Sequence, residues 1–109
     1  MDYLDNLVRS LELAEWAIDS HPDEAMSYNL KGWVLIAAED YDEAEEYLNQ
    51  ALTMDPTLAA AYLNLGTIAE AEEDYEEAKE FYKQAYTLDQ NDSVGALAAT
   101  KYNELISGE

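Results

Sequence analysis

The sequence predicts an all-α fold in which pairs of helices repeat along the chain. Ala, Leu and Glu, which favour helices, are abundant, whereas the 109 residues include only four Gly and two Pro. Three separate blocks of sequence recur at one common spacing. No segment alternates apolar and polar residues in the way that is typical of β-strands.

The recurring blocks define the repeat unit. Residues 28–32 match 62–66, residues 39–44 match 73–78, and residues 50–55 match 84–89. Because all three pairs share the same offset, they predict two whole units of equal length, over residues 25–58 and 59–92.

A glycine lies in the middle of the first helix of each unit. Gly32 and Gly66 each cost roughly 1 kcal/mol relative to Ala at such a position. This cost indicates that the helix needs a smooth surface where its hairpin partner approaches. We expect Ala44 and Ala78, twelve residues later, to be the small residues across that contact.

The second helix of each unit begins at an aspartate followed three residues later by a glutamate. Asp40 with Glu43, and Asp74 with Glu77, predict a capping box built on Asp. Among the tyrosines, those that recur at the repeat spacing are expected in the core, and the others are expected to be half-exposed. The first set is Tyr28, Tyr41, Tyr62 and Tyr75, and the second is Tyr47, Tyr82 and Tyr86.

These features together resemble the tetratricopeptide repeat. The shared features are the length of the unit, an aromatic residue before the mid-helix Gly, a small residue after the Asp-Tyr start, and Asp55-Pro56 at the end of the unit. Glu39 and Glu73 stand where the family usually has Gly, so a left-handed backbone at these positions would be mildly strained. Gln90 replaces the Pro of the second unit.

The resemblance implies one domain over residues 1–109, folded as a right-handed solenoid of helix–turn–helix units. We expect five helices of about 13–17 residues, a length usual for helical repeats. The expected order is the second helix of a half repeat at 1–24, whole repeats at 25–58 and 59–92, and a closing helix at 93–109.

The charge and the cysteine count exclude several classes of function. The net charge of −20 would repel nucleic acid and an anionic membrane surface. The chain has no Cys, and therefore no disulfide or zinc thiolate site. Neither a signal-peptide pattern nor a membrane-spanning apolar stretch occurs, so we expect a cytoplasmic protein.

No pattern of catalytic or cofactor-binding residues occurs. The chain has no nucleophile–base arrangement, phosphate-binding glycine loop or metal-ligand spacing, so we expect neither an enzyme nor a bound cofactor or metal. His21, the only histidine, is expected to be a loop residue. The carboxylates of residues 39–46 and 72–80 are expected to form a solvated acidic edge at helix starts.

The resemblance also implies a peptide-binding groove, because the first helices of the family's units line a concave surface. The residues expected there are Met26, Asn29, Trp33, Ile36, Leu63, Asn64, Thr67, Glu70, Val94, Leu97 and Lys101. Trp33 is the strongest of these, since repeat packing does not need a large apolar side chain at that position. The alternative is that the amino-terminal helix covers Trp33.

The chemistry of the groove predicts the ligand. Chaperone-type members of the family clamp a terminal carboxylate with Lys, Asn and Arg, and Asn64 fits that pattern. Trp33, Val94 and Ala98, however, stand where Asn, Lys and Arg would be needed. We therefore expect a protein or peptide partner that is apolar with basic flanks, held by a non-enzymatic scaffold.

Two other interpretations remain open: a self-assembling structural unit, and a designed or excised repeat module without its own ligand. Self-assembly would be weak and head-to-tail. It would use apolar residues on the first helix, expected at residues 4–20, and on the closing helix. The first helix has a stripe of Leu4, Leu7, Val8, Leu11, Ala14 and Ile18, with Leu13 and Trp16 exposed beside it.

Overall fold

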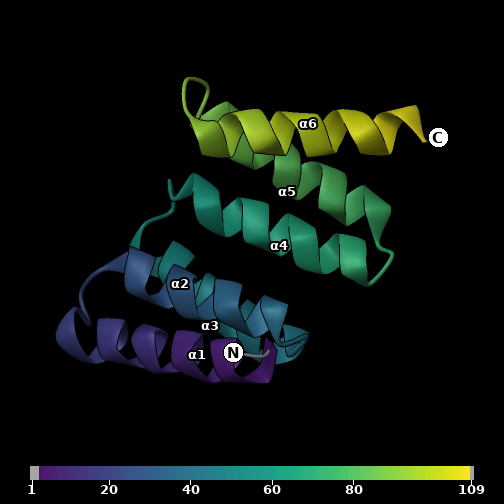
Figure 1. The fold of residues 1–109 in the computed structure, drawn as a ribbon. Coiled ribbons are helices and arrows are strands. Elements are labelled where there is room, and N and C mark those ends of the chain that lie inside the picture. The colour runs from purple at the N-terminus through teal and green to yellow at the C-terminus, as the bar shows by residue number, and fades with distance from the viewer. Residues whose placement is uncertain (1–2, 109) are drawn as a thin grey trace. The chain divides into compact units, whose positions relative to one another are not determined.

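The computed structural model describes residues 3–108, which form six α-helices and no strand (Figure 1). The helices are α1 Tyr3–Ser20, α2 Ala25–Ala37, α3 Tyr41–Met54, α4 Ala59–Ala71, α5 Tyr75–Leu88 and α6 Ser93–Ser107. The all-helical prediction is confirmed, but the number five is wrong. A half repeat, two hairpins and a closing helix already require six helices. The predicted ends of the domain, at residues 1 and 109, lie outside the described residues.

The helices divide between two compact units, residues 1–56 and 57–109. In the first unit, α2 packs against both α1 and α3. In the second unit, α5 packs against both α4 and α6, and α4 also contacts α6. Within residues 3–108, no helix combines the length and the apolar character needed to cross a membrane.

A left-handed glutamate ends α2, and another ends α4. Glu39 has a φ angle of 62° and Glu73 of 63°, so the mild strain expected for a left-handed backbone applies at both positions. The amide of Glu39 donates to the carbonyl of Ile36, and that of Asp40 to the carbonyl of Leu35, both at 2.9 Å. These bonds form a Schellman motif, which satisfies the last carbonyls of the helix and turns the chain into α3.

The mid-helix glycines let the helices of each hairpin approach closely, but large residues fill the space opposite them. A methyl group added to Gly32 would lie 2.7 Å from Cγ and Cδ2 of Leu48, and only 3.3 Å from the carbonyl oxygen of Ala44. The three atoms nearest to a methyl group on Gly66 all belong to Tyr82, not to Ala78. The expectation of small residues across the contact therefore holds in part at Gly32, where Ala44 is among the nearest neighbours, whereas Tyr82 fills the space opposite Gly66.

Tyr82 is part of the core of the second unit, with Ala69 and Ala78. Its side chain is fully buried, whereas Tyr75 is 48% exposed, which reverses the predicted environments of the two tyrosines. Tyr82 occupies the same position in its repeat as the buried Leu48 does in the preceding one, so the repeat itself assigns it to the core. Its hydroxyl donates to Oε1 of Glu70 at 2.7 Å.

The two predicted capping boxes differ. The side chain of Asp74 accepts a hydrogen bond from the amide of Glu77 at 3.4 Å. Asp40 occupies the same place before α3, but its side chain makes no bond to the helix backbone. Interaction with the neighbouring carboxyl group of Asp40 raises the pKa of Glu43 above its usual value.

Candidate functional site

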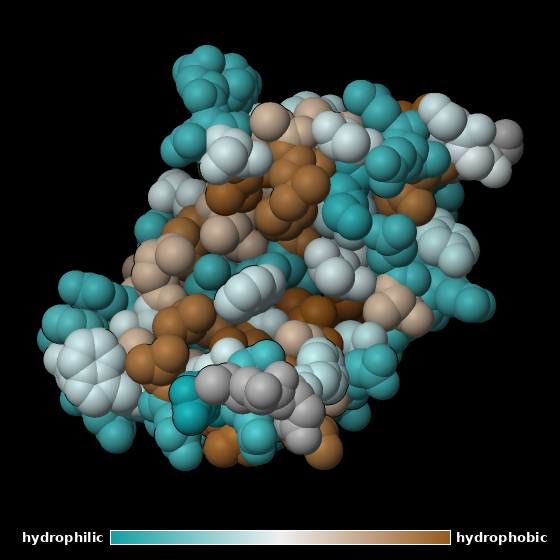
Figure 2. All heavy atoms as spheres, viewed as in Figure 1, coloured by the Kyte–Doolittle hydropathy of each residue, from teal (hydrophilic) through white to brown (hydrophobic). Residues whose placement is uncertain are grey.

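The exposed side of α2 carries large apolar residues. Met26, Trp33 and Ala37 follow one another at helical spacing, and we call them the α2 strip. Trp33 is 58% exposed and Met26 is 53% exposed. The alternative in which the amino-terminal helix covers Trp33 is therefore wrong. In Figure 2, exposed hydrophobic residues (brown) interrupt a surface that is otherwise largely hydrophilic (teal).

The remaining circumference of α2 is used for packing within the first unit. Its buried residues are Ser27, Asn29, Lys31, Gly32, Val34 and Leu35. The hydroxyl of Tyr3, an exposed residue of α1, donates to the carbonyl of Ala37. This bond fixes the start of α1 beside the carboxyl end of the α2 strip.

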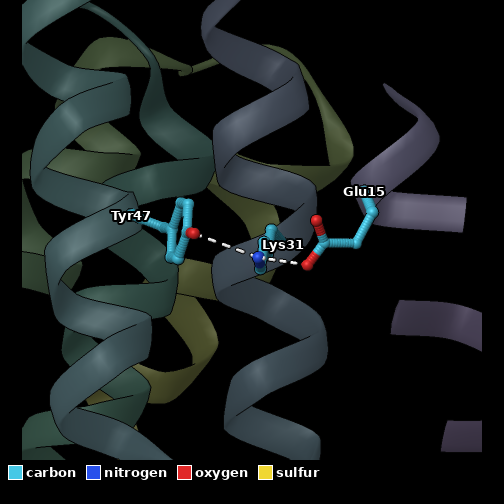
Figure 3. Close-up of polar contacts among 3 residues, drawn as sticks. All are labelled: Glu15, Lys31 and Tyr47. Carbon is cyan, nitrogen blue, oxygen red and sulfur yellow. Dashed lines mark hydrogen bonds and ion pairs between the residues drawn. The ribbon is translucent and has the colours of Figure 1, made fainter. Parts of the chain in front are cut away.

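A buried lysine joins the three helices of the first unit (Figure 3). Lys31 of α2 is 7% exposed, and its Nζ bonds to the carboxylate of Glu15 in α1 and, at 3.0 Å, to the hydroxyl of Tyr47 in α3. The Nζ also lies 4.4 Å from the centroid of the Tyr47 ring. These contacts link α2 to α1 and α3 within the first unit.

The environment of Lys31 has opposing effects on its pKa. Burial lowers the pKa, but the hydrogen bonds that Lys31 donates to Glu15 and Tyr47, together with the electrostatic attraction of these two groups, outweigh burial and raise the pKa above 10.5. Both partners of Lys31 lie sixteen residues away on other helices, so no local pattern marks this contact.

The other predicted groove residues differ in exposure. In the first unit, Ile36 is half-buried and Asn29 is buried. In the second unit, Leu97 is exposed and Asn64 is buried, whereas Leu63, Thr67, Glu70, Val94 and Lys101 are half-buried. The predicted set thus divides into one part on α2 and another part on α4 and α6.

Internal contacts occupy several side chains of the second set. Leu63 packs against the core cluster that contains Tyr82. The hydroxyl of Thr67 donates to the carbonyl of Leu63 at 3.1 Å, and Glu70 accepts the hydrogen bond of Tyr82. Leu97, at 48% exposed, is the predicted residue in this unit that presents an apolar surface most openly.

The end helices expose part of what was predicted to be an internal stripe. Leu13 and Trp16 of α1 are exposed, as expected, but so are Leu4 and Val8 of the predicted stripe. The ring of Trp16 meets His21 edge-on, with centroids 6.0 Å apart. His21 lies in the exposed turn after α1, and across residues 3–108 no cluster of His, Cys, Asp and Glu is placed to hold a metal ion.

Comparison with protein families matches residues 5–103 to the family described as the tetratricopeptide repeat protein 21 C-terminal ARM domain. No curated protein matches the chain. Among solved structures, the TPR domain of Arabidopsis OM64 is similar, with a TM-score of 0.76 and 20% identity over 92% of this chain and 83% of that one.

Two further similar structures are complexes. The TPR2B domain of yeast Sti1, in complex with pHsp70, has a TM-score of 0.81 and 22% identity over 96% of this chain and 86% of that one. The first TPR of Spaghetti (RPAP3), bound to the HSP90 peptide SRMEEVD, has a TM-score of 0.78 and 17% identity over 96% and 81%. At these identities, the likeness establishes a common fold.

Proposed function

The chain belongs to the family of the tetratricopeptide repeat protein 21 C-terminal ARM domain, and on that premise we propose that it is a non-catalytic scaffold that holds a peptide segment of another protein. Two structures of similar fold are complexes. The Sti1 domain is in complex with pHsp70, and the Spaghetti domain is bound to an HSP90 peptide. The proposal extends this mode of action to a different kind of peptide.

The observation that carries the proposal is the exposure of Trp33. A tryptophan that is 58% exposed beside an exposed Met26 contributes little to the packing of its own unit. Exposed aromatic residues of this kind are enriched among those that dominate the binding energy of protein interfaces. In the second unit, the corresponding candidate for contact with a ligand is Leu97, which is 48% exposed.

The charge distribution supports an apolar ligand with basic flanks. The chain carries 25 acidic and five basic residues, so a cationic segment is attracted and an acidic one is repelled. Lys31 is engaged inside the first unit, and Trp33, Val94 and Ala98 occupy the positions that the carboxylate clamp would need.

A pair of tryptophan variants tests the proposal. The probe is an array of apolar peptides flanked by Lys or Arg, with the same cores flanked by Glu as controls. We expect basic-flanked peptides to bind, and Trp33→Ala to weaken their binding by about 1–2 kcal/mol, as measured by fluorescence anisotropy. Trp16→Ala is the matched control, because Trp16 is also exposed but lies on α1.

Circular dichroism should show unchanged helicity in both variants. Equal binding of the Glu-flanked peptides would refute the proposed ligand chemistry. If Trp16→Ala and Trp33→Ala weaken peptide binding equally, the α2 strip is not the binding site. Concentration-dependent light scattering distinguishes peptide binding from self-assembly, the alternative function, which would increase the mass of the protein without any peptide.

A further inference from the structure

An open pocket of about 480 Å³ lies in the second unit, between the first turn of α5 and the last turn of α6. It is lined by Tyr75, Glu76, Glu104, Leu105 and Gly108. We propose that this pocket binds the guanidinium group of an arginine side chain. The α2 strip belongs to the first unit, so this second site does not depend on the peptide-binding function proposed above.

The lining residues supply the chemistry that a guanidinium group requires. Tyr75 contributes an aromatic ring that is 48% exposed, although the other tyrosines of the repeat pattern are more buried. A planar guanidinium stacks on such a ring, and the apolar side chain of Leu105 offers contact to the alkyl stem. The volume falls in the range of about 300–1,000 Å³ that is usual for small-ligand pockets.

Two carboxylates from different helices provide the opposing charge. Glu76 comes from the first turn of α5 and Glu104 from α6. Charged hydrogen bonds between a guanidinium and carboxylates are short and strong, and the fork of the guanidinium can reach two acceptors. Oε1 of Glu76 also pairs with Nζ of Lys79 at 2.9 Å; the Lys79 side chain is 15% exposed, but that of Glu76 is 86% exposed, so its carboxylate stays open to a ligand from solvent.

The backbone reinforces the preference for a cation. The carboxyl end of a helix carries partial negative charge, and the last turn of α6 has no basic residue to compensate it. Asp74 and Glu77 add negative charge around the first turn of α5, which opposes the partial positive charge of that end. An anionic ligand is therefore disfavoured on both sides of the pocket.

A titration with a charged probe and its neutral isostere tests this site. The probe is acetyl-arginine methylamide, and the control is acetyl-citrulline methylamide, which has the same shape without the charge. In two-dimensional ¹H–¹⁵N NMR, we expect the arginine probe to shift the amides of the lining residues and the citrulline probe to leave them unchanged. Equal shifts from the two probes would overturn the proposal.

Two variants separate the pocket from the general acidity of the protein. We expect Glu104→Gln to weaken binding of the arginine probe by about fivefold or more, because a charged acceptor becomes neutral. Glu80→Gln makes the same charge change on α5 at an exposed residue outside the pocket, and should change the affinity by less than about twofold. If both variants lose similar affinity for the arginine probe, or if the probe shifts NMR signals near exposed carboxylates throughout the protein, the cation binds non-specifically and not in this pocket.

Discussion

The ring of Tyr82 in α5 lies directly against Gly66 in α4, so that a methyl group added to Gly66 would stand 2.6 Å from Cε1 of the ring. The ring is fully buried, and its hydroxyl is held by Glu70 at 2.7 Å. It therefore has little freedom to move away. The close approach of the two helices depends on the absence of a side chain at residue 66.

We predict that Gly66→Ala destabilises the protein. Alanine favours a helix over glycine by about 1 kcal/mol, but overpacking a fixed core costs about 1–3 kcal/mol. The expected net loss in the free energy of unfolding is therefore up to about 2 kcal/mol, measured by urea denaturation. Gly108→Ala is the control, because the nearest atom would lie 3.6 Å from the new methyl group. A Gly66→Ala protein as stable as the parent would show that the ring can move.

Gly95→Ala should be more damaging than Gly66→Ala. A methyl group on Gly95 would overlap the carbonyl oxygen of Asp89, and a backbone atom cannot rotate away as a side chain can. The same turn is fixed by a hydrogen bond of 3.0 Å from the amide of Gly95 to Oδ2 of Asp89. We expect a loss above about 2 kcal/mol, seen as the lowest melting temperature among the glycine variants. A smaller loss than that of Gly66→Ala would contradict this ranking.

The sequence predicted the helices and their pairing because both depend on local periodicity. Because the repeated blocks share one spacing, what is inferred for one unit applies to the other. This identified Glu39 and Glu73 as equivalent turn residues, and the structure shows a left-handed backbone at both. The same spacing relates Tyr82 to Leu48, yet the type of side chain suggested a surface residue. The repeat position was the better guide, because the mid-helix glycine leaves space for a large ring.

The candidate sites were less accessible to sequence reasoning. The exposure of Trp33 was predicted, since it concerns which side of one helix a residue occupies. The pocket beside Tyr75 was not, because its lining residues come from two helices whose relevant turns are far apart in the sequence. The position of Gly95 was missed for the same reason, since its meaning depends on how closely α6 approaches the end of α5.

We predict that Lys31→Met destabilises the first unit at neutral pH by about 1–2 kcal/mol, through the loss of charged hydrogen bonds to Glu15 and Tyr47. Methionine retains the length of the apolar stem, so the loss reports mainly on the charge. Lys83→Met is the control, because Lys83 is exposed on α5. Equal stability of the two variants at pH 7 would mean that the Lys31 contacts contribute nothing.

The contribution of Lys31 should depend on pH in a definite direction. Its folded-state pKa is raised above 10.5, so its stabilisation is complete below the unfolded pKa of about 10.4 and is lost as pH rises through the folded value. Melting temperatures between pH 8 and pH 11.5 should therefore show the gap between the parent and Lys31→Met narrowing above about pH 10.5. A gap that widens with pH would contradict the raised pKa.

The pairing of Asp40 with Glu43 predicts that the protein becomes more stable as the solution turns mildly acidic. The hydrogen bond between these carboxyl groups is the main cause that raises the pKa of Glu43 above 4.5, because only one of the two groups needs to hold a proton. A raised folded-state pKa means that the folded protein binds the proton more readily. Stability should therefore increase as pH falls from 7 through the raised value toward 4.5.

The net charge of −20 should act in the same direction, so about 0.5 M NaCl is expected to raise the melting temperature at pH 7. Glu43→Gln should also raise the melting temperature at pH 7. It should make the melting temperature less dependent on pH, because the amide of Gln can donate a hydrogen bond to Asp40 without taking up a proton from solution. Glu45→Gln, which removes the same charge from an exposed position on α3, separates this local effect from general repulsion. If salt leaves the melting temperature unchanged, the repulsion argument fails. If Glu43→Gln and Glu45→Gln reduce the pH dependence of the melting temperature equally, the interaction between Asp40 and Glu43 is not the cause of that dependence.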